Sequence, residues 1–326
     1  MTYPKISVVI PSYNQGKYIE RTLLSILKQD YPGLVEVIVA DGGSTDNTVE
    51  ILRKYDDQII WWSKRDNGFA DAVNKGFSVA TGDIYSIQSS DDFYLKNAFK
   101  KAIKGFTKHP DASLIAGRDV FLDQNNKIIG YGEQEGQITP YSILFKYNPP
   151  QHTIFFKKKY FDTVGGLRSN GGVCSEVELW YRITHFAKGY FITDKMAVYQ
   201  FHQNQMTQNQ SMKIFDTLIN MIDFCESSDN YNKKFKLSSA QRNDLFNFWK
   251  IIFFNDRRIY AQNNICDKNL KKRLWDYIDS KKNKKNKFCI GSKILRHLND
   301  GNLFVVIRHK IKKIITITKP SIYWYL

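Results

Sequence analysis

The chain has 326 residues, of which 42% are hydrophobic and 14% aromatic, so it can bury a core of one large domain with an appendage, or of two domains. Its formal net charge of +16 is unevenly distributed. Residues 1–210 carry 24 basic and 22 acidic side chains, whereas residues 211–326 carry 24 and 10. A uniformly basic nucleic-acid-binding fold would not show this division, and we expect no nucleic-acid partner.

The four cysteines, Cys174, Cys225, Cys266 and Cys289, are scattered and show no CxxC spacing. This pattern argues against a zinc site and fits a reducing compartment. The N-terminus has no secretory signal, and no run approaches the roughly 20 apolar residues of a membrane-spanning helix. We therefore expect a cytoplasmic protein, soluble or peripheral at the inner face of the membrane.

Apolar patterns of strand and helix type alternate through the first third of the chain. We expect strands over 6–10, 35–39, 59–62 and 84–87, and helices over 18–29, 46–55, 70–79 and 98–106. The connections are short, so the pattern predicts a parallel sheet with helices on both faces.

The alternation changes near residue 113. We expect a hairpin over 114–123 and 127–131, a short helix over 141–145, a strand over 154–157, a helix over 176–188 and a strand over 197–201. Residues 1–210 then form one domain, divided into halves 1–112 and 113–210. Residues 211–326 form a basic helical extension, with a charged linker over 281–287.

Acidic residues follow two of the predicted strands. In an open α/β sheet, ligands bind beyond the carboxyl ends of the strands. Asp91 and Asp92 follow the strand 84–87, where they could cap a helix or form one side of a metal site. Asp41 follows the strand 35–39, where it could accept a hydrogen bond from the N3–H of a uracil ring or only shape a turn.

Several short motifs within residues 5–205 have a specific order and spacing. They are Pro11-Ser12-Tyr13-Asn14, Ala40-Asp41-Gly42-Gly43-Ser44, Asp66-Asn67-Gly68, Asp71-Ala72, Asn74-Lys75-Gly76, Ala80-Thr81-Gly82-Asp83 and Ser90-Asp91-Asp92. Together they resemble the family 2 glycosyltransferases of the GT-A fold, of the type used in bacterial polysaccharide assembly. The resemblance implies a Rossmann-like, mainly parallel α/β sheet.

The resemblance also implies a pocket for a nucleotide-sugar donor, with UDP as the favoured nucleotide. The residues that match donor-binding positions are Pro11, Tyr13, Asn14, Asp41, Arg65, Asp71, Asn74, Ser90, Asp91 and Asp92. Asp71 and Asn74 are three residues apart on one helix face, which could also be an ordinary polar face. The chain departs from the family pattern at Gly42 and Lys64, where relatives often carry acids.

The segment from Ser89 through Asp92 resembles the end of a DxD motif, and this resemblance implies a divalent metal. Asp91 matches the metal ligand, and Ser89 replaces the first acid. Mn²⁺ or Mg²⁺ would bridge Asp91 to the donor diphosphate. His202 resembles a late histidine that reaches the metal or diphosphate in some relatives, although a lone histidine can also be structural.

Glu176 matches the general base of the family. Ser175 and Glu178 have the spacing of a capping box, which leaves Glu176 free in the first helical turn, where the helix dipole should keep its carboxylate ionised. A single base on the face opposite the leaving diphosphate implies inversion. His152 and Glu178 match positions on the acceptor side.

The resulting hypothesis is a metal-dependent inverting transferase of hexosyl or N-acetylhexosaminyl groups. It would act on a glycan or lipid-linked glycan hydroxyl in surface polysaccharide biosynthesis. The amphipathic basic stretch 303–315 could contact an anionic membrane surface or dock on its own domain. One alternative is a non-catalytic nucleotide-sugar-binding assembly protein of the same fold. Another is a nucleotidyltransferase, but Ser12-Tyr13-Asn14-Gln15 stands where a triphosphate loop would be expected.

Overall fold

A computed structural model of the chain describes residues 2–145, 149–168 and 175–202. The expected helices beyond residue 210, the charged linker and the boundary near residue 210 lie outside the described residues. Within the described ranges, no helix has both the length and the apolar character needed to cross a membrane.

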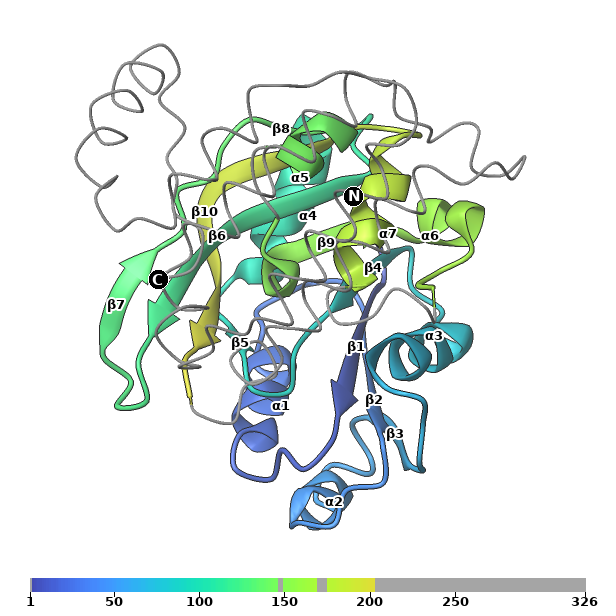
Figure 1. Cartoon of the computed structure of the whole chain (residues 1–326), viewed down its shortest axis with the longest axis vertical. Coiled ribbons are helices and arrows are strands. Elements are labelled where there is room, and N and C mark those ends of the chain that lie inside the picture. The colour runs from blue at the N-terminus through green and yellow to red at the C-terminus, as the bar shows by residue number, and fades with distance from the viewer. Residues whose placement is uncertain (1, 146–148, 169–174, 203–326) are drawn as a thin grey trace, which may run out of the picture. The chain divides into compact units, whose positions relative to one another are not determined.

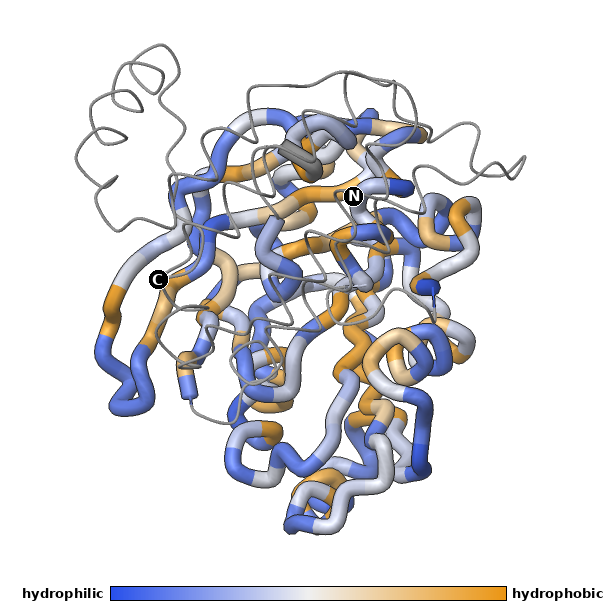
Figure 2. Tube along the Cα trace, in the orientation of Figure 1, coloured by the Kyte–Doolittle hydropathy of each residue, from blue (hydrophilic) through white to orange (hydrophobic). Residues whose placement is uncertain are grey.

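The sheet begins with four parallel strands at the blue end of the chain in Figure 1. They are β1 (Ile6–Ser12), β2 (Val35–Asp41), β3 (Ile60–Ser63) and β4 (Ile84–Ile87), in the spatial order β3-β2-β1-β4. Most residues of β1, β2 and β4 are buried, whereas those of β3 are exposed or half-buried. The tube of Figure 2, coloured by hydropathy, shows hydrophobic residues along the central strands of the sheet. The β-branched runs read from the sequence therefore form the predicted parallel strands. The register pairs Ser12 with Asp41, so the loops after β1 and β2 begin side by side.

Helices cover both faces of this sheet, as predicted. The elements are α1 (Ile19–Leu27), α2 (Thr48–Arg53), α3 (Phe69–Val79) and α4 (Ala98–Lys108). Val8 and Ile10 of β1 share one hydrophobic core with residues of α1, α2 and α4. The intervening Val9 points to the other face, where it lies against Gly76 of α3. A side chain at Gly76 would collide with Val9, so the glycine permits the close approach of α3.

The second half extends the same sheet. Its strands are β6 (Leu114–Leu122), β7 (Ile128–Tyr131), β8 (Gln137–Ile138), β9 (Ile154–Lys157) and β10 (Gly189–Gln200), and β5 (Phe93–Tyr94) of the first half joins the same sheet. The order continues from β4 as β9-β6-β10-β5, with β9 antiparallel to both of its neighbours. The predicted hairpin is confirmed, because β7 pairs antiparallel with β6. The sheet is thus parallel in most of its long pairings, with antiparallel insertions that the sequence pattern did not reveal.

In the described part of the second half, the helical segments are α5 (Pro140–Phe145), the 3₁₀ turn η1 (Gln151–Thr153), α6 (Lys158–Val164) and α7 (Ser175–Thr184). The helix expected over 176–188 ends at Thr184, and the strand expected over 197–201 begins as early as Gly189. The exposed segment 193–195 and the register shifts of β10 against β6 explain why the sequence pattern did not predict the first part of this strand.

Candidate active site

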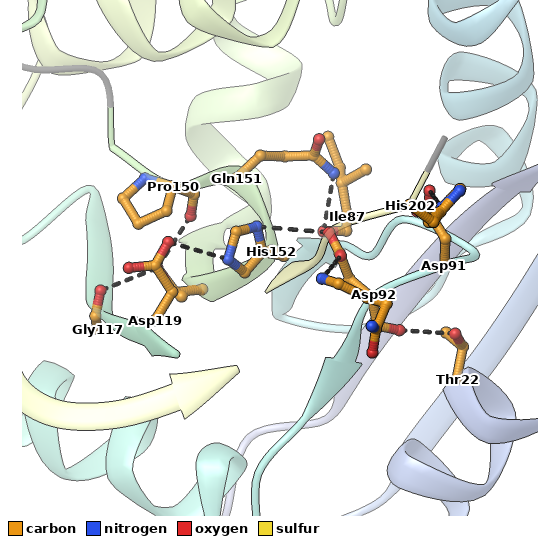
Figure 3. A network of polar contacts seen from close by, with 12 residues as sticks. Thr22, Ile87, Asp91, Asp92, Gly117, Asp119, Pro150, Gln151, His152 and His202 are labelled. Atoms are coloured by element: carbon orange, nitrogen blue, oxygen red, sulfur yellow. Dashed lines mark hydrogen bonds and ion pairs between the residues drawn. The ribbon is translucent and has the colours of Figure 1, made fainter. Parts of the chain in front are cut away.

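Asp91 and His202 face each other at the carboxyl end of the sheet. Asp91 lies in the turn between β4 and β5, and His202 follows the end of β10 by two residues. The Oδ2 atom of Asp91 is 2.9 Å from Nε2 of His202. The imidazole ring stacks on Tyr18 beside the start of α1, with a centroid separation of 4.4 Å. Two residues 111 positions apart are therefore brought together, as Figure 3 shows.

Asp92 is buried and anchored to two other elements. Its Oδ1 atom accepts a hydrogen bond of 3.0 Å from the backbone N–H of Gln200 in β10. The Thr22 hydroxyl in α1 lies 2.6 Å from the Asp92 carbonyl oxygen and 2.9 Å from that of Ser90. Burial raises the pKa of Asp92, and the nearby His152 opposes this shift. Asp92 therefore fixes the conformation of its turn rather than facing solvent.

His152 lies between two buried carboxylates (Figure 3). Its Nδ1 atom is 3.6 Å from Oδ2 of Asp92, and its Nε2 atom is 3.2 Å from Oδ2 of Asp119 in β6. Burial alone would lower the pKa of His152, but Asp119 and Asp92 outweigh burial and the net shift is upward. The acceptor-side role of His152 stays a prediction. Asp119 was missed, although an acid in the apolar strand 114–122 is a signal in itself.

Arg21 of α1 adds a cation beside the aspartate turn that sequence reasoning also missed. Its Nη2 atom is 3.4 Å from the Asp91 carbonyl oxygen, and its Nη1 atom is 3.2 Å from Oδ1 of Asn126. The guanidinium lies over the ring of Phe93, 4.2 Å from the centroid. Arg21 thereby connects the aspartate turn to the β6–β7 hairpin.

Asp41 is buried at the end of β2, and hydrogen bonds within the protein occupy its carboxylate. Oδ2 accepts bonds from the backbone N–H groups of Gly43 and Ser44, at 3.1 and 2.8 Å, and from the Ser63 hydroxyl at 2.6 Å. Oδ1 accepts a bond from the Ser44 hydroxyl. Asp41 thus shapes the turn, which was one of its two possible roles, and a contact with the base stays a prediction.

The loops that follow β1 and β2 are fastened together by Asn14. Its Oδ1 atom accepts the Thr45 N–H at 2.8 Å, and its own N–H donates to the Ser44 hydroxyl at 2.7 Å. Asn14 has a left-handed backbone with φ of 53°, a conformation that asparagine tolerates well. Pro11 lies within β1, and the Tyr13 side chain is 60% exposed at the loop. The predicted donor residues of the first loop therefore border the Asp41 turn.

Arg65 and Asp71 are the members of the predicted donor set that lie around the start of α3. Arg65 is exposed, and its backbone packs against the Gly43 turn. Asp71 accepts hydrogen bonds from Lys75 Nζ at 2.7 Å and from the Asn67 N–H at 2.9 Å. The Lys75 bond and then the Asn67 bond lower the pKa of Asp71. Donor contacts by both side chains stay predictions.

Asn74 joins α3 to the loop after α6. Its Nδ2 atom donates to the Leu167 carbonyl at 2.8 Å, and its Oδ1 atom accepts the Leu167 N–H at 2.9 Å. Gly166 has a left-handed φ of 74°, and a side chain there would collide with Asn74. Both functional ends of the amide are therefore engaged by the protein, and its predicted place in the donor pocket is untested.

We expect Asn74→Ala to lower the free energy of unfolding by about 2 kcal/mol, because it leaves both backbone groups of Leu167 without their partner. Urea unfolding followed by circular dichroism measures this change. Ser78→Ala on the same helix is the matched control and should shift stability by less than about 0.5 kcal/mol, since that hydroxyl contacts only the Lys75 carbonyl. Equal effects of the two variants would contradict the anchoring role of Asn74.

Glu176 lies in the first turn of α7 with only 8% of its surface exposed. Burial raises the pKa of its carboxyl group to about 7. Burial therefore opposes the expected effect of the helix N-terminus, because desolvation outweighs the backbone hydrogen bond that lowers the pKa of this group. A carboxyl group with a pKa near neutrality can both accept and release a proton, as a general base requires.

Glu178 forms a buried bidentate ion pair with Arg182 on the next turn of α7. Its two oxygens lie 2.6 and 2.8 Å from Nε and Nη2 of Arg182. Arg182 also donates to the carbonyl groups of Val164 and Gly166, at 2.6 and 2.7 Å. The capping-box interpretation of Glu178 is wrong, since its carboxylate turns towards Arg182. Its acceptor-side role stays a prediction.

Most of the predicted residues thus fall into three groups, and Asp71 and Asn74 on α3 lie outside them. Asp91, Asp92, His152 and His202 form one polar network at the carboxyl end of β4 (Figure 3). The residues around Asn14 and Asp41 shape the loops after β1 and β2. Glu176 and Glu178 lie on α7, and the Arg182 bonds anchor that helix to the loop after α6.

A divalent cation fits the Asp91–His202 pair. Adjacent ligands of an octahedral ion with bonds of about 2.1 Å are about 3 Å apart. The separation of 2.9 Å between Asp91 Oδ2 and His202 Nε2 agrees with that spacing. The described ranges contain no cluster of three or more His, Cys, Asp or Glu side chains that could hold a metal. The same distance is that of a hydrogen bond between the two side chains, so the roles of Asp91 and His202 as metal ligands stay predictions.

Comparison with known proteins agrees with this architecture. The family model described as "Glycosyl transferase family 2" matches residues 7–166. An uncharacterized glycosyltransferase of Rickettsia bellii is 28% identical over 214 residues, which cover 62% of this chain but only 31% of the relative. The chain therefore spans about a third of the length of that protein.

Two solved structures share the fold at 19% sequence identity. One is Staphylococcus aureus TarS 1–349 in complex with UDP-GlcNAc, with a TM-score of 0.62 and coverage of 83% of this chain and 78% of that one. The other is the mannosyltransferase PcManGT of Pyrobaculum calidifontis in complex with GDP-Man and Mn²⁺. Its TM-score is 0.56, and the match covers 75% of this chain and 71% of that one.

Proposed function

The chain belongs to glycosyl transferase family 2 through residues 7–166, and from this premise we propose that it transfers a hexosyl or N-acetylhexosaminyl group from a nucleotide-diphosphate donor to a hydroxyl of a glycan or lipid-linked glycan. The observation that carries the proposal is the Asp91–His202 pair at the carboxyl end of β4. Ligands of open α/β sheets bind at this edge. The carboxylate and imidazole there suit a metal-bound diphosphate.

UDP is the favoured donor nucleotide. The loops after β1 and β2 meet beside Asp41, and Asn14 holds them together. Such a pair of loops can enclose a nucleoside. A structural neighbour binds UDP-GlcNAc and another binds GDP-Man, so the fold accepts more than one base. The choice of UDP follows the resemblance of Asp41 to a base-contacting position.

Asp91 and His202 would hold Mn²⁺ or Mg²⁺. When bound, the ion supplies positive charge next to the departing diphosphate. Arg21 contributes a second positive charge near the same turn, because its guanidinium lies 3.4 Å from the Asp91 carbonyl oxygen. The charge that develops on the leaving nucleotide would thus meet the bound ion and the Arg21 guanidinium.

Glu176 is proposed as the general base. Its buried carboxylate would take the proton of the acceptor hydroxyl while that oxygen bonds to the anomeric carbon of the sugar. The bond from this carbon to the phosphate oxygen breaks in the same step, and the nucleoside diphosphate leaves with the bonding electrons. One displacement from the opposite face inverts the anomeric configuration. A pKa of about 7 leaves a large ionised fraction at neutral pH.

The acceptor class and the cellular site follow from the charge distribution. Residues 211–326 carry 24 basic against 10 acidic side chains. Such a segment suits an anionic membrane surface on which a lipid-linked glycan is presented. We therefore place the reaction in surface polysaccharide biosynthesis at the inner face of the cell membrane.

A screen of nucleotide sugars tests the proposed function. The full chain is incubated with UDP- and GDP-sugars in the presence of Mn²⁺, Mg²⁺ or EDTA, and nucleoside diphosphate release is measured. We expect metal-dependent release from at least one UDP-sugar and none with EDTA. Binding of UDP and Mn²⁺ with neither hydrolysis nor transfer from any donor would instead support the alternative, a nucleotide-sugar-binding assembly protein without catalysis.

A further inference from the structure

Asp92 holds both residues of the Asp91–His202 pair at once. Asp92 precedes no regular helix. Its Oδ1 atom accepts a hydrogen bond from the backbone N–H of Gln200, which lies two residues before His202. Asp91 is its chain neighbour, so this carboxylate adds a side-chain contact between the β4–β5 turn and the end of β10 to the antiparallel pairing of β5 with β10. The position of Asp91 relative to His202 therefore depends on the orientation of Asp92.

The second oxygen of Asp92 faces His152, and His152 in turn faces Asp119. The Asp92, His152 and Asp119 side chains are each no more than 4% exposed, and they come from the β4–β5 turn, η1 and β6. Asp119 Oδ1 has no hydrogen-bond partner in the part of the chain that the structure describes. An acid buried in an apolar strand is costly unless a cation pairs with it, and the imidazole 3.2 Å away provides that charge.

We propose that Asp119 and His152 are positioning residues of the metal–diphosphate site, which orient Asp92 and through it the Asp91–His202 pair. This inference rests on the proposed function for the identity of the site. Asp119 fixes the imidazole on one side, and the imidazole fixes Asp92 Oδ2 on the other. A residue of the acceptor half thus controls the geometry of ligands in the donor half.

A purely structural role for His152 would stabilise β6 and η1 without affecting Asp91. The contacts favour the positioning role, because the chain of side chains ends at the turn that carries Asp91 and not in the apolar core. Thr22 holds the backbone of this turn, but its hydroxyl contacts only carbonyl oxygens. In the part of the chain that the structure describes, Gln200 and His152 provide the hydrogen bond and the ion-pair contact of the Asp92 side chain.

The test uses the full chain with Asp119→Asn, which keeps the shape of the side chain and removes its charge. Binding of UDP is measured by calorimetry with and without Mn²⁺. We expect the affinity in the presence of Mn²⁺ to fall about 10- to 100-fold, as is typical for partners behind a metal ligand, and the affinity without metal to stay within about threefold. His152→Gln should act alike, and the double variant should be no weaker than His152→Gln.

Glu36→Gln is the matched control. It removes a carboxylate that forms an ion pair with Lys5 at 2.8 Å. This carboxylate lies near the start of β2, at the end of the strands away from the proposed site. Glu36→Gln can lower stability but should leave Mn²⁺-dependent UDP binding within about threefold of the parent. An equal loss in Glu36→Gln and Asp119→Asn, or no loss in Asp119→Asn and His152→Gln, would overturn the proposal.

A second measurement separates this inference from the proposed function. Backbone amide resonances of residues 89–93 are compared without nucleotide or metal. They should shift in Asp119→Asn and stay in place in Glu36→Gln, and unchanged resonances in Asp119→Asn would refute the positioning role. A parent protein that binds no UDP would refute the proposed site function, whereas shifted resonances would still demonstrate the coupling of Asp119 to the aspartate turn.

Discussion

Glu176→Gln is expected to reduce sugar transfer by at least about 1,000-fold, because the amide cannot accept the proton of the acceptor hydroxyl. Donor binding should persist, since the Glu176 side chain lies on α7 and the donor-site pair lies at Asp91 and His202. Transfer and UDP affinity are measured in parallel on the same preparation. The exposed Glu50 on α2 offers a control of the same chemistry, and Glu50→Gln should change transfer by less than about twofold.

The same residue predicts a dependence of transfer on pH. With a pKa of about 7, Glu176 is protonated in acid and ionised in base, so transfer by the parent enzyme should rise as the pH increases through 7. Near-parental transfer by Glu176→Gln would assign the base to another residue. A parent rate that falls between pH 6 and 8 would also contradict the assignment.

Stability should show the opposite trend in the parent. The pKa of Glu176 is about 7 when folded against an ordinary value of 4.5, so the folded state binds the proton more tightly. As the pH rises from 4.5 through 7, the parent therefore loses stability, by about 3 kcal/mol in total. Glu176→Gln lacks this loss and should become more stable relative to the parent above pH 7. Denaturant unfolding at pH 5 and pH 8 measures the difference.

Asp91→Asn is expected to abolish the gain in UDP affinity that Mn²⁺ provides. The amide lacks the negative charge of the carboxylate, so the His202 imidazole and the diphosphate would hold the ion without a protein anion beside them. We expect the affinity for UDP in the presence of Mn²⁺ to fall at least about 100-fold, a change of about 3 kcal/mol in binding free energy. The affinity without metal should change little. Calorimetric titrations with Mn²⁺ and with EDTA give both values.

Asp83→Asn provides the comparison for this change. Asp83 precedes the other end of β4, where Oδ2 accepts a hydrogen bond of 3.1 Å from the Lys5 N–H. The substitution removes a carboxylate next to the other end of β4 without touching the proposed site, so Mn²⁺-dependent binding should be preserved. If Asp91→Asn retains the full effect of Mn²⁺ on UDP affinity, Asp91 is not a metal ligand.

Local sequence patterns were sufficient for the elements of the first half except the two-residue strand β5. The apolar runs of β1 and β2 lie on a sheet with helices on both faces, so nearly every strand residue is buried and the pattern is strong. Local patterns were insufficient where two rules competed. Glu178 has capping-box spacing from Ser175 and ion-pair spacing to Arg182. The tertiary position of Arg182 decided between them. Its guanidinium is buried where it donates to the carbonyl groups of Val164 and Gly166, and a buried charge needs an opposite charge beside it.

The sequence by itself determined the alternating α/β architecture and the presence of acids where β2 and β4 end, because both depend on short-range periodicity and on the direction of parallel strands. Only the tertiary structure decided which partners those acids have. Asp91 meets His202, and Asp92 meets His152 and thereby Asp119, across sequence separations that no local pattern encodes. Tertiary burial likewise set the protonation of Glu176, since desolvation depends on the whole of the surrounding packing.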